Sequence, residues 1–67
     1  MALSARNQLS GAVKSVVLGT VMAEVVVDVG GQEVVSAITR QAVENLDVKA
    51  GDEVRVIIMS TEVMIEK

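Results

Sequence analysis

Several residue types are missing from this 67-residue chain: it contains no cysteine, histidine, proline or aromatic residue. Without cysteine there can be no disulfide and no thiolate-bound zinc, and without histidine a transition-metal site would consist of carboxylates alone. Without aromatic rings the chain cannot stack nucleic-acid bases on side chains. We therefore predict no metal site and no disulfide framework.

Positive charge is also scarce. Six lysines and arginines stand against nine acidic residues, which gives a net charge of −3. Such a chain is a poor partner for nucleic acid, whose phosphates favour lysine and arginine. Any anion that it binds should be small and held by a local set of donors.

Long apolar runs are absent as well. The uncharged runs are far shorter than the roughly 20 residues of a membrane-spanning helix, and the N-terminus has neither a basic segment nor an apolar signal core. We expect a soluble, cytoplasmic protein with no membrane partner.

The length predicts a single domain over residues 1–67. A domain of about this size buries only about 60% of the surface of its unfolded chain, so its core needs support. With disulfides and zinc excluded, a partner subunit is the usual source of that support.

Glycines and β-branched residues divide the chain into predicted strands at 3–17, 20–29, 32–39, 53–60 and 62–66. Turns are expected at Leu18-Gly19, at Gly30-Gly31 and at 49–52. Only Arg40 to Leu46 fits a helix, with Thr39 as its N-cap. Three strands, a helix and two strands are typical of the OB-fold, so we predict an all-β, five-stranded OB-like barrel with one short helix.

A second apolar face accompanies the predicted core. In the second strand one face is continuously apolar (Val21, Ala23, Val25, Val27 and Val29), but Met22 and Val26 lie on the opposite face. The fourth strand repeats this pattern with Ile57 and Met59. Either these are scattered surface residues, which are common, or they are buried between subunits. We expect a homo-oligomer.

Three groups of residues are candidates for binding an anion. Ser4, Ala5 and Arg6 offer a hydroxyl, a backbone N–H and a guanidinium. The helix start offers Thr39, Gln41 and Ala42, and Ser60 ends the fourth strand, where an OB-like barrel would bring it near the helix start. Each group also has an ordinary explanation, as a polar strand end, an N-cap or a turn.

No predicted group supplies a base, an activated nucleophile or a cluster of metal ligands. The acidic residues are spread along the chain, without a spacing that suggests shared acid-base work. The sequence therefore predicts binding without catalysis and no catalytic residue.

The chain resembles the molbindin (Mop) family of molybdate- and tungstate-binding proteins over essentially its whole length. The segments that carry the resemblance are SARNQL, GTVMAEV, the AIT before the helix and STEVMI. The resemblance implies an OB-like Mop or TOBE-like domain that forms a hexamer, a trimer of dimers, with strands exchanged or packed between subunits. It also implies that oxyanions bind at the subunit interfaces.

The resemblance further implies which residues bind the anion. Ser4, the Ala5 amide and Arg6 of one subunit form one wall, while the other wall is contributed by a neighbour (Thr39, the helix start at Gln41 and Ala42, and the strand end at Ser60). Ala42 replaces a serine that is common in the family, and Met59 replaces a lysine. Arg40 is a possible compensating donor, or else a solvated arginine, and Lys14 is a candidate for a different site.

Three functions stay open on the sequence. The first is storage or buffering of molybdate or tungstate, which would be a bound ligand and not a covalent cofactor. The second is a molbindin-fold structural or interaction module that has lost strong oxyanion affinity through Ala42 and Met59. The third, single-strand nucleic acid binding, rests on OB-fold analogy alone and is opposed by the charge and the missing aromatics.

Overall fold

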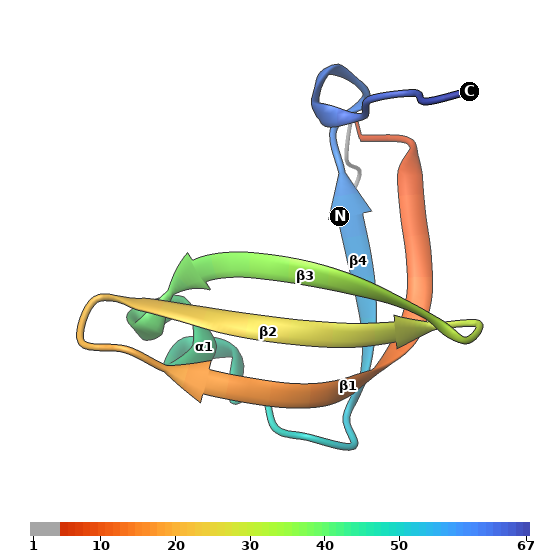
Figure 1. Cartoon of the computed structure of the whole chain (residues 1–67). Helices are drawn as coiled ribbons and strands as arrows, with labels where there is room; N and C mark the ends of the chain where they lie inside the picture. Colours follow the sequence, from red (N-terminus) through yellow and green to blue (C-terminus); the bar gives the residue numbers. More distant parts are fainter. Residues whose placement is uncertain (1–4) are drawn as a thin grey trace.

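The computed structural model describes residues 5–67 as an antiparallel sheet with one short helix. In chain order the elements are β1 (Asn7–Leu18), β2 (Met22–Val29), β3 (Gln32–Thr39), α1 (Arg40–Leu46), β4 (Glu53–Ile58) and a 3₁₀ turn at Ser60–Glu62. The strands lie in the order β3-β2-β1-β4 (Figure 1). The mostly β class and the bounds of the helix are as predicted.

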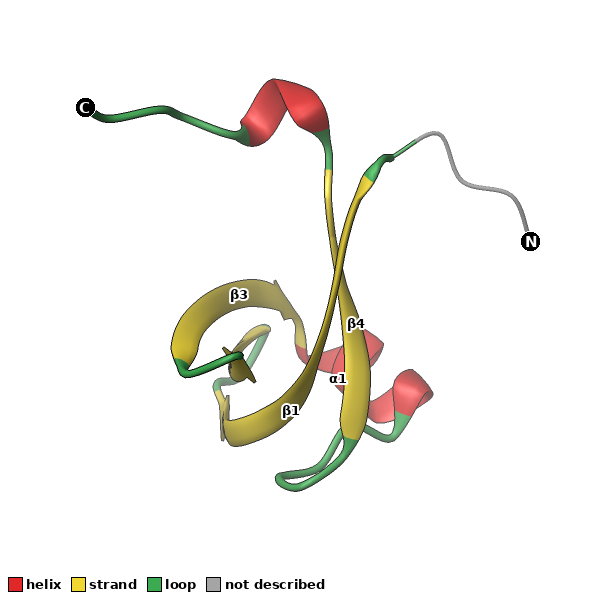
Figure 2. Cartoon of the chain, turned by 90° about the vertical axis from the view of Figure 1, so that its right-hand side faces the viewer, coloured by secondary structure: helices red, strands yellow, loops and turns green. Residues whose placement is uncertain are grey.

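β1 belongs to two pairings. Its residues Asn7–Ala12 pair with β4, and its residues from Ala12 to Leu18 pair with β2. The first part of β1 and the end of β4 therefore leave the rest of the sheet as a two-stranded arm, which is seen in two views (Figures 1 and 2). The 3₁₀ turn stands at the tip of this arm, and α1 lies with the other strands.

A β-bulge at Lys14 changes which side chains of β1 face the core. Val13 is opposite Val27 but Ser15 is opposite Val26, so Lys14 is an extra residue on β1. After the bulge Val16 packs against the core, while Val17 is 62% exposed. Simple alternation along this strand would predict the reverse.

The helix α1 is capped at both ends by the residues that flank it. The Thr39 Oγ1 accepts a hydrogen bond from the Ala42 N–H at 3.1 Å, as an N-cap does. At the other end Asp47 adopts the left-handed conformation, with φ of 54°. The N–H groups of Asp47 and Val48 donate to the carbonyls of Glu44 and Val43, each at 3.2 Å, which is the Schellman pattern.

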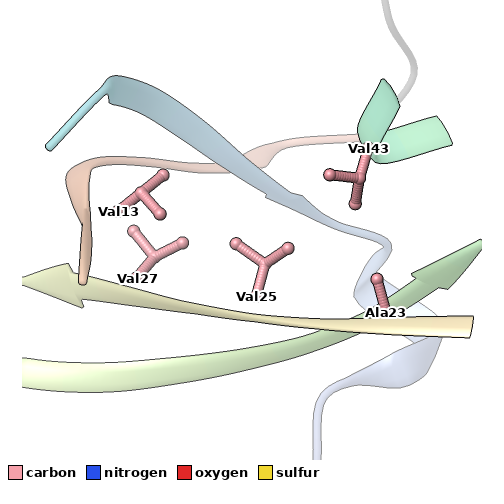
Figure 3. Close-up of a cluster of buried hydrophobic side chains, with 5 residues drawn as sticks. All are labelled: Val13, Ala23, Val25, Val27 and Val43. Atoms are coloured by element: carbon pink, nitrogen blue, oxygen red, sulfur yellow. The ribbon is translucent and has the colours of Figure 1, made fainter. Parts of the chain in front are cut away.

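The core is small and consists of five buried residues, Val13, Ala23, Val25, Val27 and Val43 (Figure 3). Three of them lie on the predicted inner face of β2. Val54 and Val56 of β4 pack against this cluster as partly buried residues. Val21, which alternation predicts on the same inner face, precedes β2 and is 70% exposed.

The predicted fifth strand at 62–66 is wrong for the described chain. Ser60–Glu62 form a 3₁₀ turn, and residues 63–67 have no regular structure. The segment starts at the tip of the arm and leads away from both strands of the arm (Figure 2). The barrel is consequently open, with β3 and β4 as the edges of the sheet.

Many apolar side chains remain uncovered in the single chain. The most exposed are in the C-terminal segment, where Met64 is 94% and Ile65 88% exposed. The other exposed large hydrophobic residues are Leu9, Val17, Leu18, Val21, Met22, Val35, Leu46, Ile57, Met59 and Val63. Met22, Ile57 and Met59 of the predicted second apolar face are thus solvent-exposed in the single chain. Val26 of that face is half-buried.

Candidate functional site

The predicted anion-binding residues fall into two groups at opposite ends of β1. Ala5 and Arg6 precede β1 and Ser60 follows β4, at the end where Asn7 is opposite Ile58. We call this the arm group. Thr39, Gln41 and Ala42 form the helix group, at the end where Thr39 is opposite Met22 and Leu18 is opposite Ala23. The expectation that Ser60 lies near the helix start is wrong within one chain (Figures 1 and 2).

The arm group presents one cation and one hydroxyl. Arg6 is exposed, and within residues 5–67 no carboxylate lies within ion-pairing distance of its guanidinium. Ser60 is exposed at the start of the 3₁₀ turn. The Ala5 carbonyl accepts a hydrogen bond from the Gln8 side chain at 3.1 Å. Ser4, the remaining predicted member, lies outside the described residues.

The helix group uses part of its donors internally. The Arg40 N–H donates to the Val21 carbonyl at 2.8 Å, and the Ala42 N–H donates to Thr39. The Gln41 N–H has no acceptor among residues 5–67. The Thr39 oxygen accepts from Ala42, which leaves its O–H available to donate. Thr39 and Gln41 are therefore the free donors, while the Ala42 amide is already engaged.

Thr39 and Gln41 of the helix group line an open hollow of about 460 Å³. The lining comes from the β1–β2 turn and from the start of α1, and its residues are Thr20, Val21, Thr39, Arg40, Gln41 and Glu44. The sequence did not place Thr20 or Glu44 among the candidate site residues. The hairpin at Gly30-Gly31 is the sequence signal that could have placed the β1–β2 turn at the site. Its register pairs Thr39 with Met22 and so brings this turn beside the helix start.

The Arg40 guanidinium is held by two neighbours at this hollow. Its Nε donates to the Glu44 Oε1 at 3.0 Å, and its Nη1 donates to the Gly19 carbonyl at 3.3 Å. The ion pair with Glu44 is exposed on both sides. The charge of Arg40 is thus balanced within the chain.

Lys14 is likewise paired and lies away from both groups. Its ammonium binds the Glu33 carboxylate, which reaches it from β3 across β2. The hydrogen bond to Glu33 and the negative charge of Glu33 raise the pKa of Lys14, burial opposes this rise, and Asp28 adds the smallest contribution. A second anion site at Lys14 would first have to displace Glu33.

The described residues offer no metal centre. In residues 5–67 no three acidic side chains come together as potential metal ligands, and the sequence has no histidine or cysteine. Within the same range, no helix has the length and apolar character needed to cross a membrane.

Residues 3–65 match the model of the TOBE domain family. Among characterised proteins, the chain is 50% identical over 66 residues to molybdenum-pterin-binding protein 3 of Clostridium pasteurianum, with 97% of each chain covered. It is 44% identical to a probable molybdenum-pterin-binding protein of Haemophilus influenzae, with 97% of this chain and 96% of the relative covered.

Solved structures with the same fold include a molybdate-binding protein from Sporomusa ovata, with a TM-score of 0.97, 45% identity and full coverage of both chains. MopII from C. pasteurianum has a TM-score of 0.92 at 45% identity, with 98% of this chain and 100% of MopII covered. The cytoplasmic molybdate-binding protein ModG, solved with molybdate bound, has a TM-score of 0.85 at 41% identity. The match covers 90% of this chain and 43% of ModG.

Proposed function

The chain belongs to the TOBE domain family, in the molbindin (Mop) group, and from this membership we propose that it binds molybdate as an intact tetrahedral oxyanion. Binding is by hydrogen bonds and charge, with no covalent link and no chemical conversion. The relatives named above are binding proteins. Tungstate has nearly the same size, shape and charge, so we include it as a ligand.

The donors of the two groups suit such an anion. A tetrahedral dianion accepts hydrogen bonds on every side and needs N–H and O–H donors. Arg6 supplies a forked, permanently charged donor, Thr39 and Ser60 supply hydroxyls, and Gln41 supplies a backbone N–H without a partner in residues 5–67. We include Ser4, Ala5 and Ala42 as predicted members of the site.

The intact oxyanion fits this chain better than a pterin-bound form of molybdenum. A pterin is a flat, conjugated ring system, and proteins commonly hold such rings by stacking them on aromatic side chains. This chain has no aromatic residue at all. We therefore propose molybdate itself as the ligand, although two of the relatives are named molybdenum-pterin-binding proteins.

One observation carries the proposal that the site forms between copies: the arm group and the helix group lie at opposite ends of β1. A small anion cannot contact both groups of one chain, but it can contact the arm group of one copy and the helix group of another. We propose a hexamer built as a trimer of dimers, in which such contacts repeat.

The uncovered apolar surface supports assembly. Full burial of a side chain such as Ile65 or Met64 stabilises a protein by about 1.5–3 kcal/mol, and both are almost fully exposed in the single chain. The open sheet also leaves the β3 and β4 edges unpaired, and such edges readily accept a strand. We propose that residues 63–67 pack on the open sheet of a neighbouring copy.

We propose storage or buffering of molybdate in the cytoplasm as the biological role, since the site offers binding groups and no catalytic group. Calorimetric titration with sodium molybdate, sodium tungstate and sodium sulfate tests the proposal. Molybdate and tungstate should bind with similar affinity and sulfate more weakly. Absence of heat and of thermal stabilisation with both molybdate and tungstate would overturn it.

A second function, an interaction module with little anion affinity, is favoured by Met59. This residue stands at the arm tip, beside Ser60, and is 59% exposed. The resemblance implies a lysine at this position. A charged hydrogen bond contributes roughly 1.5–3 kcal/mol, so its loss costs about ten- to a hundredfold in affinity. Strong molybdate binding by Met59→Lys, combined with none by the unaltered chain, would favour this function.

A further inference from the structure

We propose that Glu44 limits the anion affinity of this chain by holding the Arg40 guanidinium, and that a bound oxyanion takes Arg40 over from Glu44. The inference rests on the proposed function, because it assigns to Arg40 and Glu44 the tuning of that same site. The sequence left two explanations open for Arg40 and gave no reason to place Glu44 at the site.

The geometry of the hollow brings the two side chains to the proposed ligand. Arg40 is the one cation among the six residues that line it, and Glu44 is the one anion. Arg40 stands directly between the two free donors of the helix group, Thr39 and Gln41. In the unliganded chain the pair is closed at 3.0 Å, so this wall of the site presents no net charge.

The pair is weak enough to be opened by an anion. Both side chains are exposed, at 45% for Arg40 and 58% for Glu44, and ion pairs of this spacing on an exposed helix surface change an equilibrium only about twofold. A dianion carries twice the charge of a carboxylate and offers two oxygens to the guanidinium fork. The exchange of Glu44 for the anion therefore favours binding, while Glu44 competes with the anion for Arg40.

A structural role is the alternative explanation of Arg40. Its Nη1 donates to the Gly19 carbonyl, so the side chain also ties the β1–β2 turn to α1. In that case a change at Arg40 would lower thermal stability and leave affinity untouched. A change at Glu44 does not remove the contact with Gly19, so it separates the two roles.

The experiment compares molybdate affinity in the full chain and in four variants, Arg40→Gln, Arg40→Lys, Glu44→Gln and the double variant Arg40→Gln/Glu44→Gln. The matched controls are Lys49→Gln and Asp47→Asn. These residues form the other exposed ion pair of the helix region, at 3.3 Å, beyond the end of α1 and outside the hollow. Affinity is measured by calorimetric titration with sodium molybdate at fixed ionic strength, and folding by thermal unfolding.

We expect Glu44→Gln to tighten binding about two- to fivefold. Arg40→Gln should weaken it about tenfold, the low end for a charged hydrogen bond. Arg40→Lys, which keeps the charge without the fork, should fall between Arg40→Gln and the unaltered chain. The two controls should stay within about twofold of the unaltered chain.

The double variant is decisive for the mechanism. If Glu44 acts by holding Arg40, its removal gives no gain in the Arg40→Gln background. An equal gain in both backgrounds would overturn the proposal, as would unchanged affinity in Arg40→Gln and Glu44→Gln. Absence of binding by the unaltered chain would overturn both the proposed function and this inference. Binding by the unaltered chain without the expected changes in the variants would overturn this inference alone.

Discussion

Gly11 of β1 lies against Asp28 of β2 so closely that a Cβ atom on Gly11 would stand 2.5 Å from the Asp28 carbonyl oxygen. The contact is with backbone, which cannot rotate away as a side chain can. Gly11 is opposite Val54, within the part of β1 that pairs with β4. The arm can therefore leave the sheet here only because residue 11 has no side chain.

Gly11→Ala should consequently destabilise the fold by about 2–3 kcal/mol, the upper part of the range for overpacking. Urea unfolding monitored by far-ultraviolet circular dichroism measures the change. Ser10→Ala, at the neighbouring exposed position of β1, serves as the control and should change stability by less than about 0.5 kcal/mol. Equal stabilities of the two variants would contradict the close approach.

Thr39→Ala should destabilise the fold by about 1 kcal/mol, because the Ala42 N–H loses its only side-chain acceptor at the helix start. Thr39→Ser keeps the hydroxyl and should recover most of this loss. The proposed site adds a second effect, a weaker affinity for molybdate in Thr39→Ala than in Thr39→Ser. Unfolding and titration of the same samples separate the two, and equal behaviour of both variants would speak against the cap.

Asp47→Gly should stabilise the fold by about 0.5–1 kcal/mol. Asp47 has a φ of 54°, and the left-handed conformation costs a residue with a side chain more than it costs glycine. The ion pair with Lys49 that is lost is exposed and contributes little. Asn45→Gly, inside the helix, should not stabilise. A lower midpoint of thermal unfolding in Asp47→Gly would contradict this account of the helix end.

The ion pair of Lys14 and Glu33 predicts a dependence on alkaline pH. Glu33 raises the pKa of Lys14 in the folded protein above its ordinary value of 10.5. The stabilisation is therefore fully present below pH 10.5 and is lost as the pH rises through the folded-state pKa. Lys14→Met should be less stable than the unaltered chain at pH 8, and the difference should shrink above pH 11. A difference that grows with pH would contradict the pairing.

Local signals in the sequence were enough for the helix and for the β2–β3 hairpin, whereas the turn predicted at Leu18-Gly19 lies between Leu18 and Met22. Thr39 marks the start of α1, and Gly30-Gly31 both have the positive φ that a type I′ hairpin turn requires. Alternation in β2 correctly predicted that Ala23, Val25 and Val27 are buried. These features depend on a few adjacent residues, which is why the sequence alone reveals them.

Features that depend on a distant partner were not predictable in this way. Residues 63–67 have a strand-like composition, but a strand forms only where the segment runs alongside a partner strand, and this segment leads away from the strands of its own chain (Figure 2). The bulge at Lys14 arises from the pairing of β1 with two different strands. The separation of Ser60 from Thr39 follows from the same pairing, and no local motif signals it.

The proposed function requires that the arm group of one copy and the helix group of another form the same site. The most direct test unfolds a mixture of Arg6→Gln and Thr39→Ala chains, refolds them together and counts molybdate sites by titration. Random mixing should restore full affinity at about a quarter of the sites. At these sites a Thr39→Ala chain contributes its intact arm group and an Arg6→Gln chain contributes its intact helix group. If the refolded mixture binds no better than either variant alone, the two groups do not meet across copies, and the claim is wrong.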